Sequence, residues 1–172
     1  MPTVESLIAG HKESITRQWI EVALKTYPAE TASFFLREKD RFANPVAGSL
    51  SESLTKVIDG LASQASQNEL SECLDAAIRV RAVQSFAPSE AVSFIFSLKQ
   101  IIRDVTGGQG DNDNSGPYRQ LDKKIDELVL LGFDKYMECR EKIFELRAYE
   151  ARNRVFKAFE KAGLVSDPEQ TN

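Results

Sequence analysis

Apolar residues recur every three to four positions along almost the whole of this 172-residue chain, and alternating apolar and polar runs are nearly absent. Such spacing places the apolar side chains on one face of a helix, whereas a period of two would indicate strands. The pattern therefore predicts an all-α protein. Turn signals divide it at Pro28, at Asn44-Pro45, at the polar link 63–68 and at Pro88.

The segment after Pro88 is apolar nearly all round, with Val92, Phe94, Ile95, Phe96, Leu98, Ile101, Ile102 and Val105. A helix without a polar face has to be surrounded by other helices. We therefore expect one helix here, at the centre of a bundle. Thr3 is expected to cap the first helix, which ends before Pro28.

The last helix is predicted to run from Pro117 to Ala162, with Gly163 as its stop. Up to Leu146 its apolar residues share one face, but afterwards they lie on roughly the opposite side, at Ala148, Tyr149, Val155, Phe156, Phe159 and Ala162. Either the helix kinks near Ala148, or its end leaves the bundle and packs on another chain. In the second case Tyr149, Val155, Phe156 and Phe159 form a dimer or partner contact.

Three regions follow from these patterns. Residues 1–147 are predicted to form a helical bundle domain, residues 148–165 a helical extension, and residues 166–172 a disordered tail. Residues Gly107–Gly116 contain almost nothing that can be buried, and we expect a flexible surface loop there. That loop lacks the Gly-Lys-Ser/Thr ending of a phosphate-binding loop.

Charge and cysteine content narrow the class of protein. The chain has 22 basic and 26 acidic residues, for a net charge of −4, and a general nucleic-acid binder needs a basic face instead. Cys73 and Cys139 lie far apart, so neither a disulfide framework nor a zinc site is indicated. The N-terminus does not resemble a secretory signal, and no apolar run approaches the roughly 20 residues of a membrane span. We expect a cytoplasmic protein.

His11 is the only histidine and lies within the apolar stripe of the first helix. It is either a ligand or pH-sensing group or, more simply, a core or edge residue bonded to a backbone carbonyl. A single histidine excludes the usual hydrolytic triads and multi-histidine metal sites. No paired-carboxylate motif of the di-iron type is present, so we expect no enzyme, metal or cofactor.

Arg81 continues the core-facing stripe of its helix, whereas Arg79 points away from it. A cation on such a stripe is either paired with a carboxylate or offered to an anionic ligand, and we expect the pair. Trp19, Phe94 and Phe96 either line an apolar ligand pocket or are plain core. A possible ligand pocket would thus combine His11, Trp19, Arg81, Phe94 and Phe96.

Three segments resemble the N-terminal sensor domain of the RsbRD type, which takes its name from the RsbT co-antagonist proteins of bacterial stress signalling. They are HKESITRQWIEVALKTYP (His11–Pro28), FANPVAGSLSESL (Phe42–Leu54) and IRVRAVQSFAPSEAVSFIFSLKQIIRD (Ile78–Asp104). The resemblance covers most of residues 4–106 in the expected order. One departure is Ala87 before Pro88-Ser89-Glu90, where a serine would complete a capping box.

The resemblance implies a globin-like helical bundle, generally dimeric, that signals through its last helix to an attached output domain. No βαβ pattern for such an output domain follows, so a partner is expected to be bound in trans. No haem is expected, because the one histidine is in the first helix. Similar stand-alone proteins suggest a regulatory or electron-transfer-linked partner.

The sequence thus predicts a sensory or regulatory module that acts by protein–protein interaction. The alternative is a small-molecule sensor or carrier with an apolar pocket inside the bundle. A weaker third possibility is an enzyme with a site built from scattered acids.

Overall fold

The computed structural model describes residues 3–84, 86–108 and 116–165, and within these ranges all regular structure is helical. The helices are α1 (Val4–Lys25), α2 (Ala29–Arg37), α3 (Pro45–Ala62), α4 (Gln67–Val83), α5 (Pro88–Ser93), α6 (Ser97–Thr106) and α7 (Gly116–Lys161). The predicted all-α class with a long last helix is confirmed. The globin-like arrangement stays a prediction. The predicted tail 166–172 and residues 109–115 of the predicted loop lie outside the described residues.

Helices α1, α3 and α4 begin where capping side chains satisfy their first free N–H groups. Thr3 accepts from the backbone N–H of Ser6 at 3.2 Å, and Asn44 accepts from that of Ala47 at 3.3 Å, with Pro45 in the first turn. Ser66 and Glu69 form a reciprocal capping box at the start of α4. The polar and proline signals in the sequence therefore mark true helix starts.

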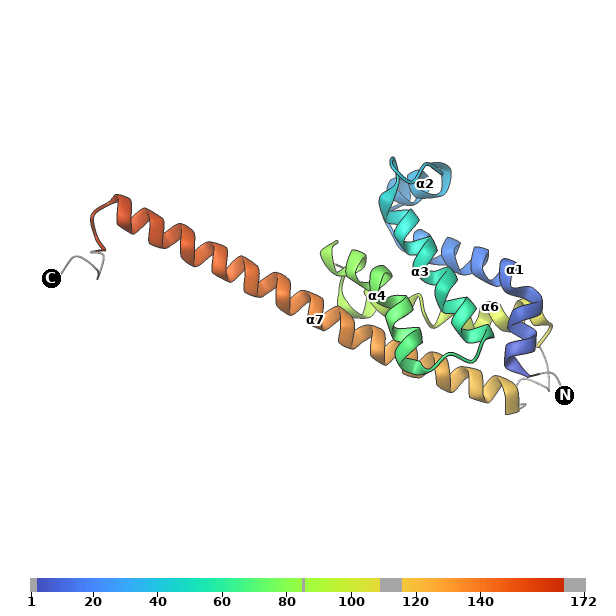
Figure 1. Ribbon diagram of the computed structural model, residues 1–172. Coiled ribbons are helices and arrows are strands. Elements are labelled where there is room, and N and C mark those ends of the chain that lie inside the picture. Colours follow the sequence, from blue (N-terminus) through green and yellow to red (C-terminus); the bar gives the residue numbers. More distant parts are fainter. Residues whose placement is uncertain (1–2, 85, 109–115, 166–172) are drawn as a thin grey trace.

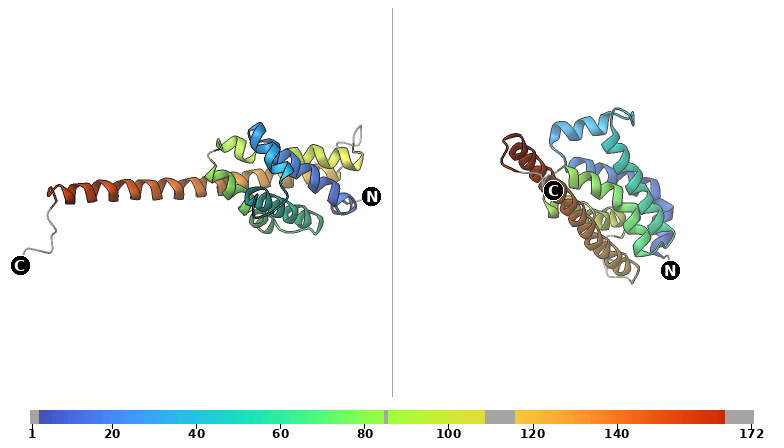
Figure 2. Two further views of the ribbon diagram at one scale, coloured as in Figure 1. Left: turned by 90° about the horizontal axis from the view of Figure 1, so that it is seen from above. Right: turned by 60° about the vertical axis from the view of Figure 1, so that its left-hand side comes forward.

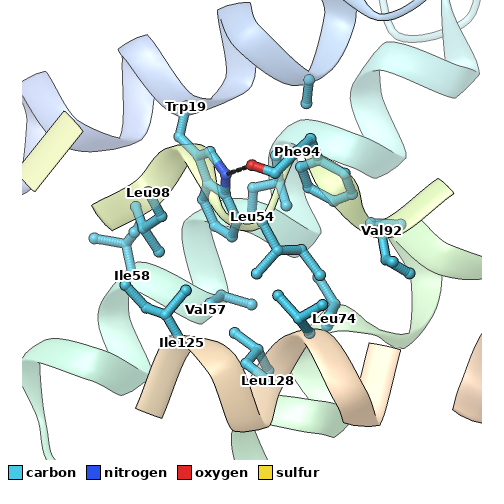
Figure 3. Packing of buried hydrophobic residues seen from close by; sticks show 14 of the residues in the cluster. Trp19, Leu54, Val57, Ile58, Leu74, Val92, Phe94, Leu98, Ile125 and Leu128 are labelled. Atoms are coloured by element: carbon cyan, nitrogen blue, oxygen red, sulfur yellow. Dashed lines mark hydrogen bonds between the residues drawn. The ribbon is translucent and has the colours of Figure 1, made fainter. Parts of the chain in front are cut away.

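The core lies between α1, α3, α4, α6 and the first half of α7 (Figure 1). Its fully buried apolar side chains come from every one of these helices and include Ile15, Trp19, Leu50, Leu54, Ile58, Leu74, Ile78, Leu98, Ile125 and Leu128. Figure 3 shows how part of this set interlocks. Each such side chain stabilises the fold by about 1.5–3 kcal/mol through removal of apolar surface from water. Burial of these stripes, more than helix propensity, holds the helices together.

The prediction of one continuous helix after Pro88 is wrong. The chain forms the short helix α5, a tight turn at Phe94–Phe96, and then α6. Within the turn, hydrogen bonds reach back three residues, as from Ile95 N to Val92 O (3.0 Å) and from Leu98 N to Ile95 O (3.1 Å). The turn also exposes one side of the segment to solvent, and Phe96 on that side is 48% exposed.

Helix α7 crosses the bundle with its first half and projects from it with its second half (Figures 1 and 2). Its buried residues end at Tyr136, and every residue from Phe144 to Lys161 is exposed. The close approach of the first half depends on Gly132. A methyl group at that position would lie 3.1 Å from Ile95 Cδ1 and 3.3 Å from Leu74 Cδ2. At 46 residues, the helix is about 70 Å long.

Of the two alternatives for α7, the structure shows no kink near Ala148. The helix is uninterrupted to Lys161, and Gly163 (φ +68°) then ends it, as predicted. The Gly163 amide donates to Glu160 O and that of Leu164 to Phe159 O, both at 3.0 Å. A left-handed glycine of this kind closes many helices. The end of α7 therefore leaves the bundle.

Candidate functional site

Trp19 and Phe94 meet in the core, where their rings stack with centroids 5.8 Å apart. The indole Nε1 donates to Phe94 O at 3.0 Å (Figure 3). That carbonyl is available because the amide of Leu98, four residues on, bonds to Ile95 O instead. The Ser97 hydroxyl also donates to Phe94 O, at 2.6 Å, so two side chains satisfy this carbonyl. Trp19 thus stabilises the break between α5 and α6.

Arg81 is fully buried, as its place on the core-facing stripe of α4 predicted. The prediction that a carboxylate pairs with it is wrong. Its guanidinium donates to Ala91 O at 2.9 Å, to Glu90 O at 3.0 Å and to the hydroxyl oxygen of Thr26 at 3.0 Å. The two carbonyls belong to α5, which is too short to use them in helical hydrogen bonds. Backbone oxygens on a broken helix therefore take the place of an acid, and a sequence pattern does not reveal such acceptors.

Three aromatic rings surround the same guanidinium. Its carbon atom lies 4.1 Å from the ring centroid of Phe86, 4.9 Å from that of Phe94 and 5.5 Å from that of Tyr27. The faces of aromatic rings attract a cation, more strongly when water is excluded. Burial nevertheless lowers the pKa of Arg81 from its ordinary value, because the charged form loses its hydration. The charge is held by π faces and carbonyl dipoles.

Tyr27 is the unusual member of this group. Its hydroxyl is buried and, among the described residues, has no hydrogen-bond partner. Burial raises the pKa of this phenol, and the neighbouring Arg81 charge offsets only part of that rise. Sequence analysis missed Tyr27 because nothing distinguishes an aromatic residue before a proline from an ordinary core residue.

The connection from α4 to α5 joins this cluster directly to α7. The Tyr136 hydroxyl donates to Phe86 O, and Arg140 Nη1 donates to Ala82 O at 3.0 Å. Arg140 also lies over the ring of Phe144, 4.8 Å from its centroid. Tyr136 and Arg140 of α7 therefore bond to Phe86 and to the last turn of α4. Phe86 is also one of the rings that enclose Arg81. We call Arg81, Tyr27, Phe86 and Phe94 the Arg81 cluster.

His11 lies apart from the Arg81 cluster. Its backbone leaves the helical region (φ −128°, ψ 15°) and bends α1. The exposed ring places Nδ1 3.1 Å from Leu7 O, a contact that matches the backbone-bonded alternative. Phe96 is also separate, with Lys99 Nζ 5.7 Å from its ring centroid. Of the five predicted pocket residues, the structure thus brings together Trp19, Arg81 and Phe94 only.

An open groove of about 1250 Å³ runs between α1, α2 and α3. Apolar side chains on its floor include Ile20, Leu24 and Phe35, while His11 and Arg17 belong to its rim. Its charged lining is mixed, with Lys12, Arg17, Lys39 and Arg41 beside Glu13, Glu21 and Glu38. Among the described residues, no three His, Cys, Asp or Glu side chains gather closely enough to hold a metal ion.

The projecting half of α7 exposes large apolar side chains. Those most exposed are Phe144 (55%), Leu146 (62%), Tyr149 (57%), Val155 (54%), Phe156 (52%) and Phe159 (46%). A shallow hollow of about 420 Å³ forms between Ala151, Arg152, Val155, Phe156 and Phe159. The four residues predicted as a contact surface thus lie on the part of α7 that projects from the bundle (Figure 1). Soluble monomeric proteins rarely expose apolar surface of this extent.

Comparison with known proteins places this arrangement in a family. Residues 13–150 match the family model described as the RsbT co-antagonist protein rsbRD N-terminal domain. The chain belongs to this RsbRD N-terminal family. The match covers most of the helical bundle, including the Arg81 cluster, and ends at residue 150, so Val155, Phe156 and Phe159 lie beyond it. Membership identifies the chain as a regulatory module of stress signalling.

A relative in the archaeon Archaeoglobus fulgidus is 25% identical over 142 residues, which cover 81% of this chain and 83% of that protein. It is an uncharacterized protein. No solved structure matches the chain. None of the helices in the described residues combines the length and the apolar composition that crossing a membrane requires.

Proposed function

We propose that this RsbRD-type domain is a non-enzymatic sensory module that acts by protein–protein interaction through the projecting half of α7. The observation that carries the proposal is the division of one helix into two environments. Residues up to Tyr136 are buried in the bundle, whereas Phe144, Val155 and Phe159 are exposed beyond it. A rigid helix of this kind can carry a displacement in the bundle to a surface about 30 Å away.

The Arg81 cluster supports a route for such a displacement. Arg81 ties α4 to α5. Of the α7 side chains, Tyr136 bonds to Phe86, which follows α4, and Arg140 bonds to Ala82 in the last turn of α4. A shift of α5 would therefore change the hydrogen bonds that position α7 at the edge of the bundle. Cation–π contacts and carbonyl hydrogen bonds give the cluster a defined geometry.

We further propose that the active form is a homodimer. A symmetric pair is the commonest way for a protein to cover an exposed apolar surface. Tyr149, Val155, Phe156 and Phe159 are the predicted contacts, since aromatic residues dominate interface energetics. A cytoplasmic location and a regulatory or electron-transfer-linked protein as the further partner stay predictions.

Light scattering tests the dimer. The intact chain should be dimeric, and a chain that ends at Arg147 should be monomeric with the stability of the bundle retained, because the deleted residues contact nothing in the bundle. If both chains are monomeric, or if the truncated chain remains a dimer, the projecting half is not the dimer interface.

The groove between α1, α2 and α3 supports a second candidate function, the binding of a small molecule. Its apolar floor and mixed charged rim are typical of ligand sites. It differs from the sequence-based alternative, because it lies on the surface and Trp19, Phe94 and Phe96 do not line it. Native mass spectrometry of the protein purified from its own organism would test this. A bound small molecule that is lost on Leu24→Trp substitution supports a ligand site. The absence of a bound small molecule counts against one.

A further inference from the structure

We propose that Arg81 and Tyr27 form an anion site for the carboxylate of a small molecule whose apolar body lies in the groove between α1, α2 and α3. This inference rests on the ligand-binding function proposed above for the groove, and it names the class of ligand. A straight-chain carboxylate has this chemistry, with one negatively charged end and an apolar remainder. The Arg81 cluster and the groove meet at Phe35, which belongs to both.

The hydrogen-bond acceptors of Arg81 among the described residues are all uncharged. A guanidinium carries five N–H donors, and the three described bonds of Arg81 go to two carbonyls and to the Thr26 hydroxyl. Glu90 supplies one of these carbonyls, but its carboxylate accepts from the amide of Ala87 at 3.2 Å on the surface. A buried cation is costly unless an opposite charge accompanies it. An anion at Arg81 would therefore stabilise the charge that the bundle has buried.

The hydroxyl of Tyr27 is a second unused group at the same place. Tyr27 is only 7% exposed, and its hydroxyl has no hydrogen-bond partner among the described residues. Its ring centroid lies 5.5 Å from the guanidinium carbon of Arg81, and each group shifts the pKa of the other. A phenol O–H donates to a carboxylate in a charge-assisted hydrogen bond. A carboxylate has two oxygens, so one ligand can accept from both residues.

The rings around Arg81 determine the direction from which a ligand can approach. Phe86 and Phe94 lie near the guanidinium carbon, with ring centroids at 4.1 and 4.9 Å, so an anion approaches the N–H groups along their edge. Nη1 of Arg81 donates to Thr26, which is an exposed residue after α1. That end of the guanidinium therefore lies beneath the connection between α1 and α2, close to the surface.

Phe35 separates the Arg81 cluster from the groove. Its ring packs edge-on against Tyr27, with centroids 5.0 Å apart, and Phe35 also lines the groove beside Leu24. Phe35 belongs to α2, in which Ala32 is the only buried residue among nine, and α2 begins without a side-chain cap. Figure 1 shows α2 at the periphery of the bundle. Segments with so few buried residues open at low cost, and a displacement of α2 would connect the groove to Tyr27 and Arg81.

The groove suits the apolar part of the ligand. Its floor includes Ile20 and Leu24, and its volume is about 1250 Å³. Affinity should therefore increase with the length of the apolar chain, because more apolar surface leaves water. The charged rim is mixed in sign, so preference for a carboxylate depends on Arg81 and Tyr27.

Isothermal titration calorimetry of the full-length chain with octanoate tests the site. Octanoate should bind, whereas acetate, which lacks the apolar body, and octan-1-ol, which lacks the charge, should bind at least about tenfold more weakly. Tyr27→Phe should weaken the binding of octanoate by about tenfold. Tyr27→Phe is preferred to an Arg81 variant because the unpartnered hydroxyl contributes no hydrogen bond to stability.

Tyr118→Phe is the matched control for this substitution. Tyr118 is also 7% exposed, and its hydroxyl lies 2.8 Å from Thr106 Oγ1, outside the groove and the Arg81 cluster. This variant should bind octanoate as the unmodified chain does. Equal weakening by Tyr27→Phe and Tyr118→Phe would show a general effect on the fold and overturn the anion site.

Stopped-flow fluorescence tests the entry past Phe35. Trp19 is the only tryptophan, and it stacks on Phe94, so its emission reports on the Arg81 cluster. On mixing with octanoate, the signal should change faster in Phe35→Ala than in the unmodified chain, because the ring closes the passage. Phe34→Ala, at a neighbouring residue that does not line the groove, should keep the original rate. Equal rates for all three chains overturn entry past Phe35.

The remaining outcomes separate this inference from the groove function. Octanoate and octan-1-ol that bind equally well, with no effect of Tyr27→Phe, overturn the anion site and retain an apolar ligand site in the groove. Acetate that binds as tightly as octanoate overturns the link between the anion site and the groove. A chain that does not bind octanoate overturns the inference. If native mass spectrometry then also finds no bound small molecule, the groove function is overturned with it.

Discussion

At the scale of single residues, the buried charge of Arg81 is held without an acid. Its hydrogen bonds go to Glu90 O, Ala91 O and Thr26, and rings enclose its plane. A guanidinium suits this site because it offers five N–H donors in one plane and stacks on aromatic faces. Lysine has neither property, so the site specifies arginine.

We expect Arg81→Ala to lower the free energy of unfolding by about 3–5 kcal/mol, since it leaves a cavity and removes the donor to Ala91 O, whereas Glu90 O keeps the Ser93 hydroxyl. Arg79→Ala is the matched control. Arg79 pairs with Asp75 on the surface, and its loss should cost at most about 1 kcal/mol. Urea denaturation measures both, and equal midpoints would contradict the structural role of Arg81.

Tyr27 and Tyr136 form a second matched pair. We expect Tyr27→Phe to leave stability unchanged or raise it by about 1 kcal/mol, because its buried hydroxyl has no partner among the described residues. Tyr136→Phe should lower stability by about 1 kcal/mol, because it removes the bond to Phe86 O. Denaturation curves of the two variants test this, and a larger loss for Tyr27→Phe would contradict it.

The raised pKa of Tyr27 predicts a change of stability with pH. An unfolded tyrosine ionises at about pH 10, whereas Tyr27 in the folded protein ionises only at higher pH. Between these two pKa values the unfolded state therefore binds fewer protons than the folded state. Stability from this group is therefore complete below pH 10 and is lost as the pH rises toward the folded pKa. Above pH 10 the native protein should lose stability more steeply than Tyr27→Phe. Parallel slopes in denaturation across this range would show that Tyr27 does not contribute.

At the scale of helices, the break between α5 and α6 leaves backbone carbonyls free, and side chains from other helices bond to them. Trp19 of α1 bonds to Phe94 O, and Arg81 of α4 bonds to the carbonyls of Glu90 and Ala91. A continuous helix would use those carbonyls internally and leave both donors unpaired in the core. The break and the two donors therefore depend on each other.

Trp19→Phe tests this dependence, because it retains an aromatic ring and removes the donor. We expect a loss of about 1–3 kcal/mol from the lost hydrogen bond and the lost volume, because the Ser97 hydroxyl still donates to Phe94 O. Hydrogen exchange should become faster for amides of residues 94–98 than for those of α3. Uniform acceleration across all helices would show that Trp19 stabilises the core without a specific role at the break.

At the scale of the whole molecule, α7 makes the domain a bundle with a projecting rod (Figure 2). If the rod dimerises, unfolding is linked to association, and stability rises with protein concentration. The midpoint of thermal unfolding should then rise across a hundredfold range of concentration for the intact chain. For a chain ending at Arg147 it should stay constant. A concentration-independent midpoint for the intact chain would contradict the dimer.

The sequence by itself determined the class of fold and most helix boundaries. Thr3, Asn44-Pro45, Pro88 and Gly163 act through hydrogen bonds and backbone angles within a few residues, so a local pattern is sufficient to predict them. The face switch along the last helix is also local, because helical geometry fixes the direction of each side chain. It left two alternatives, a kink near Ala148 or a departure from the bundle, and the structure shows the departure, with Tyr149 and Phe159 exposed.

Only the tertiary structure decided how the core satisfies its polar groups. Arg81 bonds to carbonyls nine and ten residues away, Trp19 to one 75 residues away, and Tyr136 to one 50 residues away. The acceptors of Arg81 and Trp19 exist because the segment after Pro88 breaks, and an apolar run contains no signal for such a break. Apolar periodicity predicts which side chains are buried, whereas the partner of a buried donor depends on where several distant helices meet. For this reason the expected carboxylate at Arg81 and the unbroken helix after Pro88 were both wrong.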